Sequence, residues 1–210
     1  MKEADSVFNP AFQQKNLDAK LIIALERMSE VFRAALWEAG KPFRLSPLQI
    51  QILLFVRFHP AESSTVSNLA REFNLRKPTI SEAVRTLLAK ELIEKLPAPL
   101  DTRSYFIRLT KAGTQTVRQL NGFTENIQLV MGSVEDAAKG AFYQQLLNLL
   151  SQFQRHGLIQ QQRSCHQCEF YRSSEDGDHC DLLKTALKPV DLRIDCPEFQ
   201  PQTPVDSHSA

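Results

Sequence analysis

Residues 76–113 read RKPTISEAVRTLLAKELIEKLPAPLDTRSYFIRLTKAG, and this stretch decides the fold. A helix is expected to open at Pro78, because proline suits the first turn of a helix. Apolar residues then recur at helical spacing and mark its inward face: Ile80, Val84, Leu87 and Leu88. Further on, apolar residues alternate with their neighbours, as they do in a strand: Tyr105, Ile107 and Leu109. Together with the short apolar run at 92–96, this alternation predicts a β-hairpin around a loop of prolines and polar residues.

Three further helices are predicted before this stretch. The first carries one apolar stripe: Leu17, Leu21, Leu25, Met28, Phe32 and Leu36. Gly40 and Pro42 end it. The second opens with Ser46 as its N-cap and Pro47 in the first helical position, and Pro60 ends it. The third is short and follows the polar cluster at 63–65. This order of elements is that of a winged helix-turn-helix, so the predicted fold class is mainly α with a small β-hairpin.

The predicted helix from Pro78 presents a polar face that suits the major groove of DNA. Its solvent-facing positions are Thr79, Ser81, Glu82 and Arg85. Arg76 and Lys77 stand at its start, where positive charge and free backbone N–H groups attract phosphates. Residues 46–113 hold ten Lys and Arg against six Asp and Glu, although the net charge of the whole chain is only +1. An ordinary solvated helix face is the alternative, and the order of the elements with this local charge favours DNA.

Several short motifs occur in a fixed order along residues 15–157. They are Leu45-Ser46-Pro47-Leu48-Gln49, Leu69-Ala70, Pro78-Thr79-Ile80-Ser81, Leu92-Ile93, Asp101-Thr102-Arg103-Ser104 and Leu109-Thr110-Lys111-Ala112-Gly113. In this order and spacing they resemble the MarR (multiple-antibiotic-resistance regulator) family. The resemblance implies a winged-helix regulator in which the arginine of the wing, Arg103, enters the minor groove. It also implies that Asp101 helps to hold this arginine.

Two positions depart from the pattern of that family. The position after Ser81 is usually basic and is Glu82 here, which either accepts from a cytosine amine or weakens the attraction for phosphates. The usual glycine before Leu92 is replaced by Glu91. Because glycine normally supplies a left-handed helix end, the start of the wing is expected to differ in this chain.

The N-terminal helix and the helices expected between residues 112 and 156 hold more apolar residues than a small winged domain needs. They either pack within their own chain or form a dimer. We predict an intertwined homodimer on a palindromic DNA site, as the resemblance also implies. The resemblance further implies a cleft for a small aromatic effector. The candidates to line it are Phe32, Trp37, Phe43 and Phe58, although such aromatic residues are more often plain core.

Four cysteines follow in the pattern Cys165-x2-Cys168-x11-Cys180-x15-Cys196. Four thiols are the number that a tetrahedral S4 site needs, and a bound metal would stabilise a segment with few large apolar residues. Zinc is favoured by the Cys-x2-Cys start. An iron–sulfur cluster is the alternative, because the last two cysteines are isolated and a proline follows the second. Metal-free, redox-active thiols are a third possibility. His166 and His179 are expected to be supporting or surface residues. The module is thus a candidate sensor of metal or redox state.

No run of about 18 apolar residues is present, and the N-terminus lacks the apolar core of a signal peptide, so a cytoplasmic location is expected. No phosphate loop, nucleophile elbow or paired-carboxylate motif points to an enzyme. The predicted organisation is a dimerisation helix (1–45), a winged helix-turn-helix (46–112), two dimerisation helices (113–159), the cysteine module (160–200) and a disordered tail (201–210). The predicted function is sequence-specific transcriptional regulation. The alternative is a winged-helix protein-interaction adaptor with structural zinc.

Overall fold

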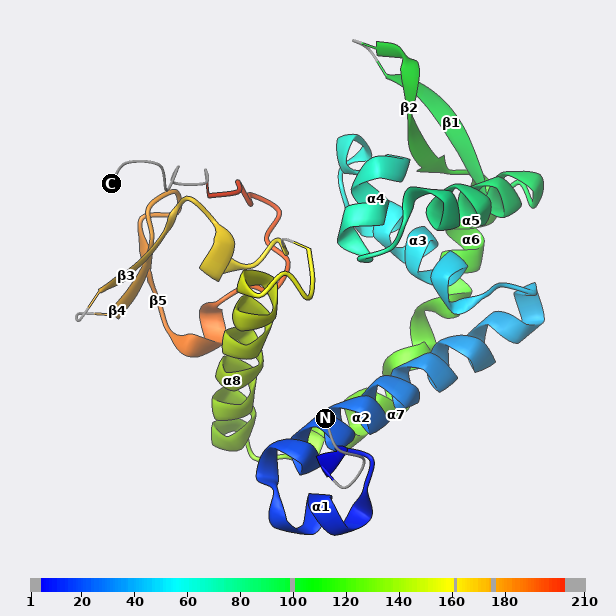
Figure 1. The fold of residues 1–210 in the computed structure, drawn as a ribbon. Helices are drawn as coiled ribbons and strands as arrows, with labels where there is room; N and C mark the ends of the chain where they lie inside the picture. Colours follow the sequence, from blue (N-terminus) through cyan, green and yellow to red (C-terminus); the bar gives the residue numbers. More distant parts are fainter. Residues whose placement is uncertain (1–4, 99–100, 161, 175–176, 203–210) are drawn as a thin grey trace.

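A computed structural model describes residues 5–98, 101–160, 162–174 and 177–202, without the side chains of 98, 101–104 and 121. Its helices are α1 (Pro10–Lys15), α2 (Leu17–Gly40), α3 (Pro47–Phe58), α4 (Val66–Glu72), α5 (Lys77–Ala89), α6 (Lys111–Leu120), α7 (Glu125–Gly132) and α8 (Asp136–Arg155). Its strands are β1 (Ile93–Ala98), β2 (Asp101–Leu109), β3 (Tyr171–Ser174), β4 (Gly177–Cys180) and β5 (Thr185–Leu187). In Figure 1 the winged unit (α3–α6 with β1 and β2) lies at the upper right, and α8 leads to the cysteine module at the left.

The winged unit confirms the predicted fold class. Ser46 caps α3 in a capping box with Gln49, and Pro47 occupies the first turn. Thr65 caps the short α4 through its hydroxyl. The apolar faces of the helices and the hairpin meet in one core, whose fully buried members include Ile50, Ile52, Leu53, Leu69, Ile80, Leu87, Ile107 and Leu120. This core holds α5 in place with its polar side outward.

The start of the wing corrects the expectation attached to Glu91. This glutamate adopts the left-handed conformation itself, with φ at 56°. The Leu92 N–H bonds to the Leu87 carbonyl at 3.1 Å, and the Glu91 N–H bonds to the Leu88 carbonyl at 2.9 Å. These two bonds form the Schellman motif that a glycine usually permits. The wing therefore starts as it would with glycine, because the backbone pattern is kept in spite of the side chain.

Gly113 explains the end of the wing motif. A Cβ atom at this position would lie 1.9 Å from the Leu92 carbonyl oxygen and 2.9 Å from its carbon. The same carbonyl accepts the Thr110 N–H at 3.1 Å, so the first turn of α6 is packed against the root of the hairpin. Only glycine permits this close approach, and it fixes how the hairpin leaves the core.

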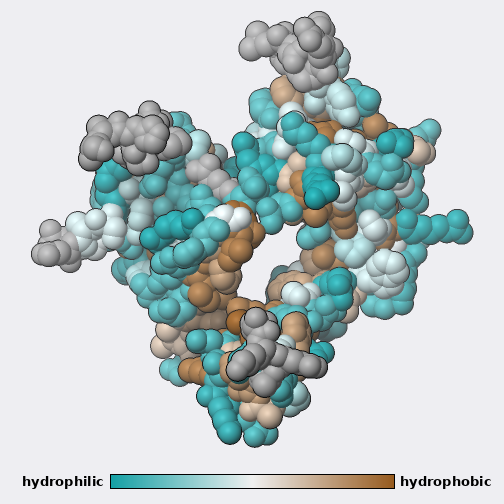
Figure 2. All heavy atoms as spheres, viewed as in Figure 1, coloured by the Kyte–Doolittle hydropathy of each residue, from teal (hydrophilic) through white to brown (hydrophobic). Residues whose placement is uncertain are grey.

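The long helices outside the winged unit leave much of their apolar surface uncovered in the single chain. On α2 the exposed apolar residues are Leu17, Leu21, Ile22, Met28, Val31, Phe32 and Trp37. On α7 and α8 they are Leu129, Val130, Met131, Phe142, Leu149 and Phe153. Figure 2 shows apolar side chains along the central opening, on the side of α8 and at the base where α2 and α7 lie. Packing within the chain therefore does not account for these stripes.

The C-terminal segment forms a small antiparallel sheet in the order β3–β4–β5. Short 3-10 turns flank it at Cys165–Gln167 and Pro189–Asp191. Pro201 pairs with Cys168, and the Gln202 N–H bonds to the Gln167 carbonyl at 3.1 Å. The module thus extends at least to residue 202, and the rest of the predicted tail lies outside the described residues. Within the described chain, no helix combines the length and the apolar character that crossing a membrane requires.

Candidate nucleic-acid interface

The polar face of α5 lies where the sequence placed it. Arg76 is the N-cap and Lys77 the first residue of the helix, and both are exposed. Thr79, Glu82 and Arg85 are exposed along the helix, and Ser81 is half-buried. The opposite side sits in the core, with Ile80 and Leu87 fully buried. The helix is therefore held rigidly and offers one row of polar groups to a groove.

Glu82 and Arg85 form an ion pair on this face, with Arg85 Nη1 2.8 Å from Glu82 Oε2. Their side chains are 64% and 72% exposed, so water screens the pair and it contributes little to stability. The pair neutralises the arginine in the free protein. Because the exposed pair contributes little free energy, hydrogen-bond acceptors in a DNA groove could take the Arg85 guanidinium from Glu82 at little cost in stability.

The wing supplies a second group of charged residues. The backbones of Asp101 and Arg103 lie in β2, and their side chains lie outside the described residues, so the roles implied for them stay predictions. Nearer the root, Arg108 donates two hydrogen bonds to Glu94 Oε1, at 2.7 and 3.0 Å. Lys95 lies over the Tyr105 ring, with its ammonium nitrogen 4.3 Å from the ring centre. This cation–π contact holds one cation of the wing in place.

Two polar residues of α4 belong to the same surface and were missed from the sequence. Ser67 and Arg71 line a hollow together with Arg76 and Lys77 of α5. Gln160, which follows α8, borders the same hollow. The order of the elements could have predicted them, because a helix-turn-helix places its first helix beside the start of the second. Arg71 is exposed there. Three cations therefore gather at one end of the reading helix.

The aromatic residues considered for an effector cleft do not meet in one place. Trp37 lines a hollow with Glu30, Arg33, Ala34, Glu38 and Pro47, and none of the other three candidates borders it. Phe43 packs against the winged core. Phe32 and Phe58 are exposed. Among the four aromatic candidates in the described chain, Trp37 is therefore the one placed at a hollow that could hold an effector.

The four cysteines are free thiols and gather in the small C-terminal module. Burial raises the pKa of the Cys165 thiol, the backbone N–H of Arg193 lowers it, and negative charge on Cys196, Cys168 or Cys180 raises it further. In the described residues, however, no three His, Cys, Asp or Glu side chains are gathered as a bound metal ion requires.

The two histidines beside the cysteines have other partners, as expected. His166 packs edge-on against the Tyr171 ring, with ring centres 5.2 Å apart. His179 Nδ1 lies 3.4 Å from Asp181 Oδ1. Neither histidine is therefore needed to complete a set of four thiols.

Comparison with known proteins agrees with this geometry. Residues 45–104 match the family model of the MarR family. Residues 45–104 form a MarR-type winged helix. No curated relative matches the chain.

Solved structures extend the MarR-type likeness to the helices around the winged unit. The S. aureus MepR–DNA complex aligns with a TM-score of 0.57 and 22% identity, over 62% of this chain and 96% of MepR. The MarR family transcription regulator SP03579 aligns with a TM-score of 0.60 and 17% identity, over 71% of this chain and 98% of that one. A MarR regulator from Methanosarcina mazei gives 0.53 and 16%, over 66% and 96%. At these identities the likeness establishes the fold alone.

Proposed function

We propose that this protein is a sequence-specific DNA-binding transcriptional regulator that acts as a homodimer on a palindromic site. The observation that carries the proposal is the reading face of α5, with its apolar side locked in the core and Thr79, Glu82 and Arg85 exposed beside the β1–β2 wing. The fold it shares with MepR, a protein whose structure was solved with DNA, supports the same assignment.

Different residues have different tasks in this proposal. Arg71, Arg76 and Lys77 contact phosphates, since they gather at the start of the reading helix. Arg85 leaves Glu82 and reaches a base edge in the major groove. The wing follows the backbone into the minor groove, where Arg103 reads its width and charge.

The homodimer is supported by the uncovered apolar stripes of α2, α7 and α8. Leu129 and Val130 on α7 are 76% and 66% exposed. Contiguous apolar surface of this kind marks an interface, and a two-fold dimer brings two reading helices to successive major grooves. Leu129→Glu is expected to produce monomers in light scattering, whereas Leu182→Glu, in the cysteine module, leaves the dimer intact. Equal masses for both variants would contradict this arrangement.

A small-molecule effector is proposed for the hollow at Trp37. It lies beside the start of α3, where α2 meets the winged unit, so an occupant there would alter the angle between the dimerisation helices and α5. Quenching of Trp37, the single tryptophan of the chain, reports such binding directly.

The DNA-binding proposal is tested by measuring duplex affinity across a series of salt concentrations. Each lost phosphate contact reduces the slope of log K against log salt by about 0.9. Lys77→Ala is expected to lower both affinity and slope for any duplex. Arg85→Ala and Arg103→Ala are expected to lower affinity for the operator, taken from the promoter region of its own gene, more than for random DNA. Arg118→Ala, on α6, is the matched control for lost charge.

The result that overturns the proposal is unchanged affinity in the Arg85→Ala, Arg103→Ala double variant at every salt concentration. Duplex binding without salt dependence in the unaltered protein would also contradict it. In that case the protein-interaction adaptor becomes the better reading, because the Glu82–Arg85 pair leaves the reading face nearly neutral.

A further inference from the structure

Backbone pairing brings the first and last cysteines of the module together. The Cys165 N–H bonds to the Arg193 carbonyl at 3.0 Å, and the Arg193 N–H points back to the Cys165 sulfur at 3.1 Å. Two residues before Cys165 and three residues after Arg193, the Cys196 N–H bonds to the Arg163 carbonyl at 2.9 Å. These three bonds tie the chain before Cys165 to the chain before Cys196, although they are about thirty residues apart.

The other two cysteines are joined to this pair through the first strand of the sheet. Cys168 closes the turn that begins at Cys165, with its N–H on the Cys165 carbonyl at 3.0 Å. The Tyr171 N–H then bonds to the Cys168 carbonyl at 3.1 Å. Tyr171 is paired with Cys180 across β3 and β4. All four thiols are therefore placed in one module by its hydrogen-bond pattern.

The chemistry of this donor set is that of a soft metal centre. Four thiolates are the ligands of structural zinc and of iron–sulfur clusters. The module has little else to stabilise it, since Cys168, Leu192 and Cys196 are its buried apolar residues. A metal centre here requires the thiols to move together, because they are not gathered at binding distance in this structure.

Such a movement would act on the segment around Cys196. Its thiol now contacts Arg193 Nη1 at 3.6 Å and Glu198 Oε2 at 3.4 Å. A metal ion held by the Cys196 thiolate would compete with these two contacts. Asp195 immediately precedes Cys196, so a shift of Cys196 would reach it through one peptide bond.

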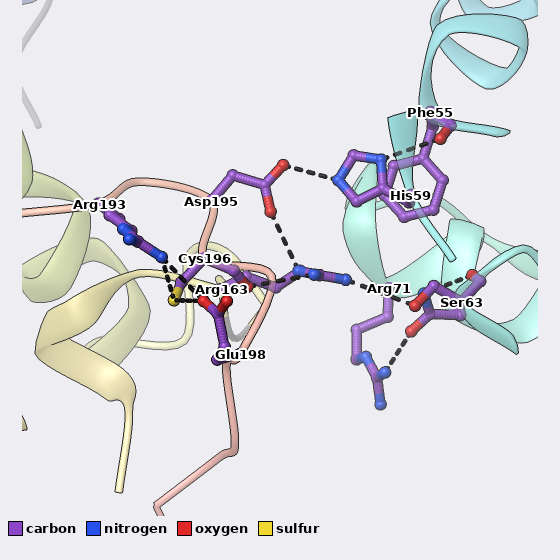
Figure 3. A network of polar contacts seen from close by, with 10 residues as sticks. Phe55, His59, Ser63, Arg71, Arg163, Arg193, Asp195, Cys196 and Glu198 are labelled. Atoms are coloured by element: carbon purple, nitrogen blue, oxygen red, sulfur yellow. Dashed lines mark hydrogen bonds and ion pairs between the residues drawn. The ribbon is translucent and has the colours of Figure 1, made fainter. Parts of the chain in front are cut away.

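Asp195 is also the point where the module is held against the winged unit (Figure 3). Its Oδ2 lies 2.7 Å from His59 Nε2, at the end of α3. Its Oδ1 lies 3.0 Å from Arg163 Nε, and this guanidinium also reaches Ser63 Oγ at 3.5 Å. The side chains of His59 and Arg163 are only 13% and 15% exposed, whereas that of Asp195 is 45% exposed, so water reaches the contact from the side of the carboxylate. We call Asp195, His59 and Arg163 the latch.

The latch is connected to the core that holds the reading helix. His59 stacks on Phe55, with ring centres 3.8 Å apart and planes 7° from parallel. Its Nδ1 lies 2.9 Å from the Phe55 carbonyl. Phe55 is buried and packs edge-on against Phe73, just before the turn that leads to α5. A displaced Asp195 therefore changes the support of the helix-turn-helix at its base.

We propose that Cys165, Cys168, Cys180 and Cys196 hold one thiolate-bound metal centre, zinc or an iron–sulfur cluster, and that the latch transmits its presence to the DNA-reading helix. The second part rests on the proposed function. It makes the module a metal-responsive control element, in which the two states of the site favour different positions of α4 and α5.

The metal site is tested on the full chain without DNA. Anaerobically purified protein is assayed for zinc, iron and acid-labile sulfide per chain, and colourless protein with one zinc is distinguished from brown protein with iron and sulfide. Stripped protein is titrated with Co²⁺, whose thiolate charge-transfer absorption reports sulfur ligation. Cys180→Ser is expected to weaken binding at least about tenfold, whereas Ser174→Ala, in the same hairpin, leaves it unchanged. Absence of stoichiometric metal together with absence of the cobalt–thiolate band overturns the site.

The latch is tested with a matched pair of variants. Asp195 and Asp181 each directly adjoin a cysteine and each contact one arginine and one histidine, but those of Asp181 belong to the module itself. Metal removal is expected to change the operator affinity of the unaltered protein about tenfold, within the range usual for coupled sites. Asp195→Asn should still bind the metal, but its operator affinity should be nearly the same with and without metal. Asp181→Asn should show the same change in affinity on metal removal as the unaltered protein.

A second readout separates failure of the latch from failure of DNA binding. Amide exchange at residues 59–64 is measured without DNA, and metal removal is expected to speed it in the unaltered protein and in Asp181→Asn. Asp195→Asn should exchange fast in both states. The coupling is overturned if metal removal changes neither amide exchange nor operator affinity in the unaltered protein. It is also overturned if Asp195→Asn responds to metal removal as the unaltered protein does. Protein that shows the exchange response but binds no duplex contradicts the proposed function alone.

Discussion

Gly113→Ala tests whether the root of the wing is fixed by close backbone contact. The added Cβ would lie 1.9 Å from the Leu92 carbonyl oxygen, and the Leu109 side chain is 3.3 Å away on another side. The backbone must therefore move by about 1 Å, which costs about 1–3 kcal/mol as overpacking. The Thr110 N–H bond to the same carbonyl is strained or lost, which adds about 1 kcal/mol. We expect the variant to lose about 2–4 kcal/mol of stability.

The assay for this variant is urea unfolding at fixed protein concentration, followed by circular dichroism and paired with duplex affinity. Gly132→Ala is the control, because this glycine ends α7 and a Cβ there meets nothing within 4 Å. The control should be neutral or gain up to about 1 kcal/mol from helix propensity. Opposite signs for the two changes support the reasoning. A loss below about 0.5 kcal/mol for Gly113→Ala, with duplex affinity intact, would refute it.

Three further substitutions test separate features. Glu82→Gln removes the partner of Arg85 and one negative charge from the reading face, so affinity for random duplex should rise several-fold in gel-shift assays at low salt. Burial is the main cause that raises the pKa of Glu72 above its ordinary 4.5, and the negative charge of Asp195 is the second. The folded chain therefore binds the Glu72 proton more tightly than the unfolded chain does, and the protein loses stability as the pH rises from 4.5. Glu72→Gln should accordingly raise the urea midpoint at pH 7 and have little effect at pH 4. Glu91→Gly relieves the left-handed φ and should add about 0.5–1 kcal/mol to the unfolding free energy, whereas Ala89→Gly should lower it.

The winged unit was predictable because its signals are local. Ser46 with Pro47, the helical spacing after Pro78 and the alternation up to Leu109 each decide one element from a few neighbouring residues, and the structure confirms all three. The replacement of glycine by Glu91 was misleading. Residue type predicts a left-handed helix end only statistically, and here the packing of Leu92 on the core outweighs a strain of about 1 kcal/mol.

The contacts between distant segments were not predictable in the same way. His59 and Asp195 are 136 residues apart, and neither belongs to a motif that names a partner. Arg163 directly follows three glutamines at 160–162, a polar stretch with no apolar periodicity, yet it is largely buried against Ser63 and Asp195. The short helix α1 also went unpredicted, because six residues carry too little periodicity to be recognised. Pairing of this kind depends on the fold that brings the segments together.

The C-terminal half of the chain bears on the reading helix in two ways, through the proposed dimer interface and through the latch. On one side, the exposed apolar stripes of α7 and α8 would set, in the proposed dimer, the spacing between two copies of α5. On the other side, the segment that follows α8 contacts the winged unit twice. The Leu158 carbonyl accepts a hydrogen bond from Asn74, in the turn before α5, at 3.4 Å, and further along the chain Arg163 and Asp195 belong to the latch. A change in the cysteine module can therefore alter both the support of each reading helix and the distance between the two. Because affinity for a palindromic site depends on that distance, a displacement too small to unfold either unit is sufficient to change DNA binding.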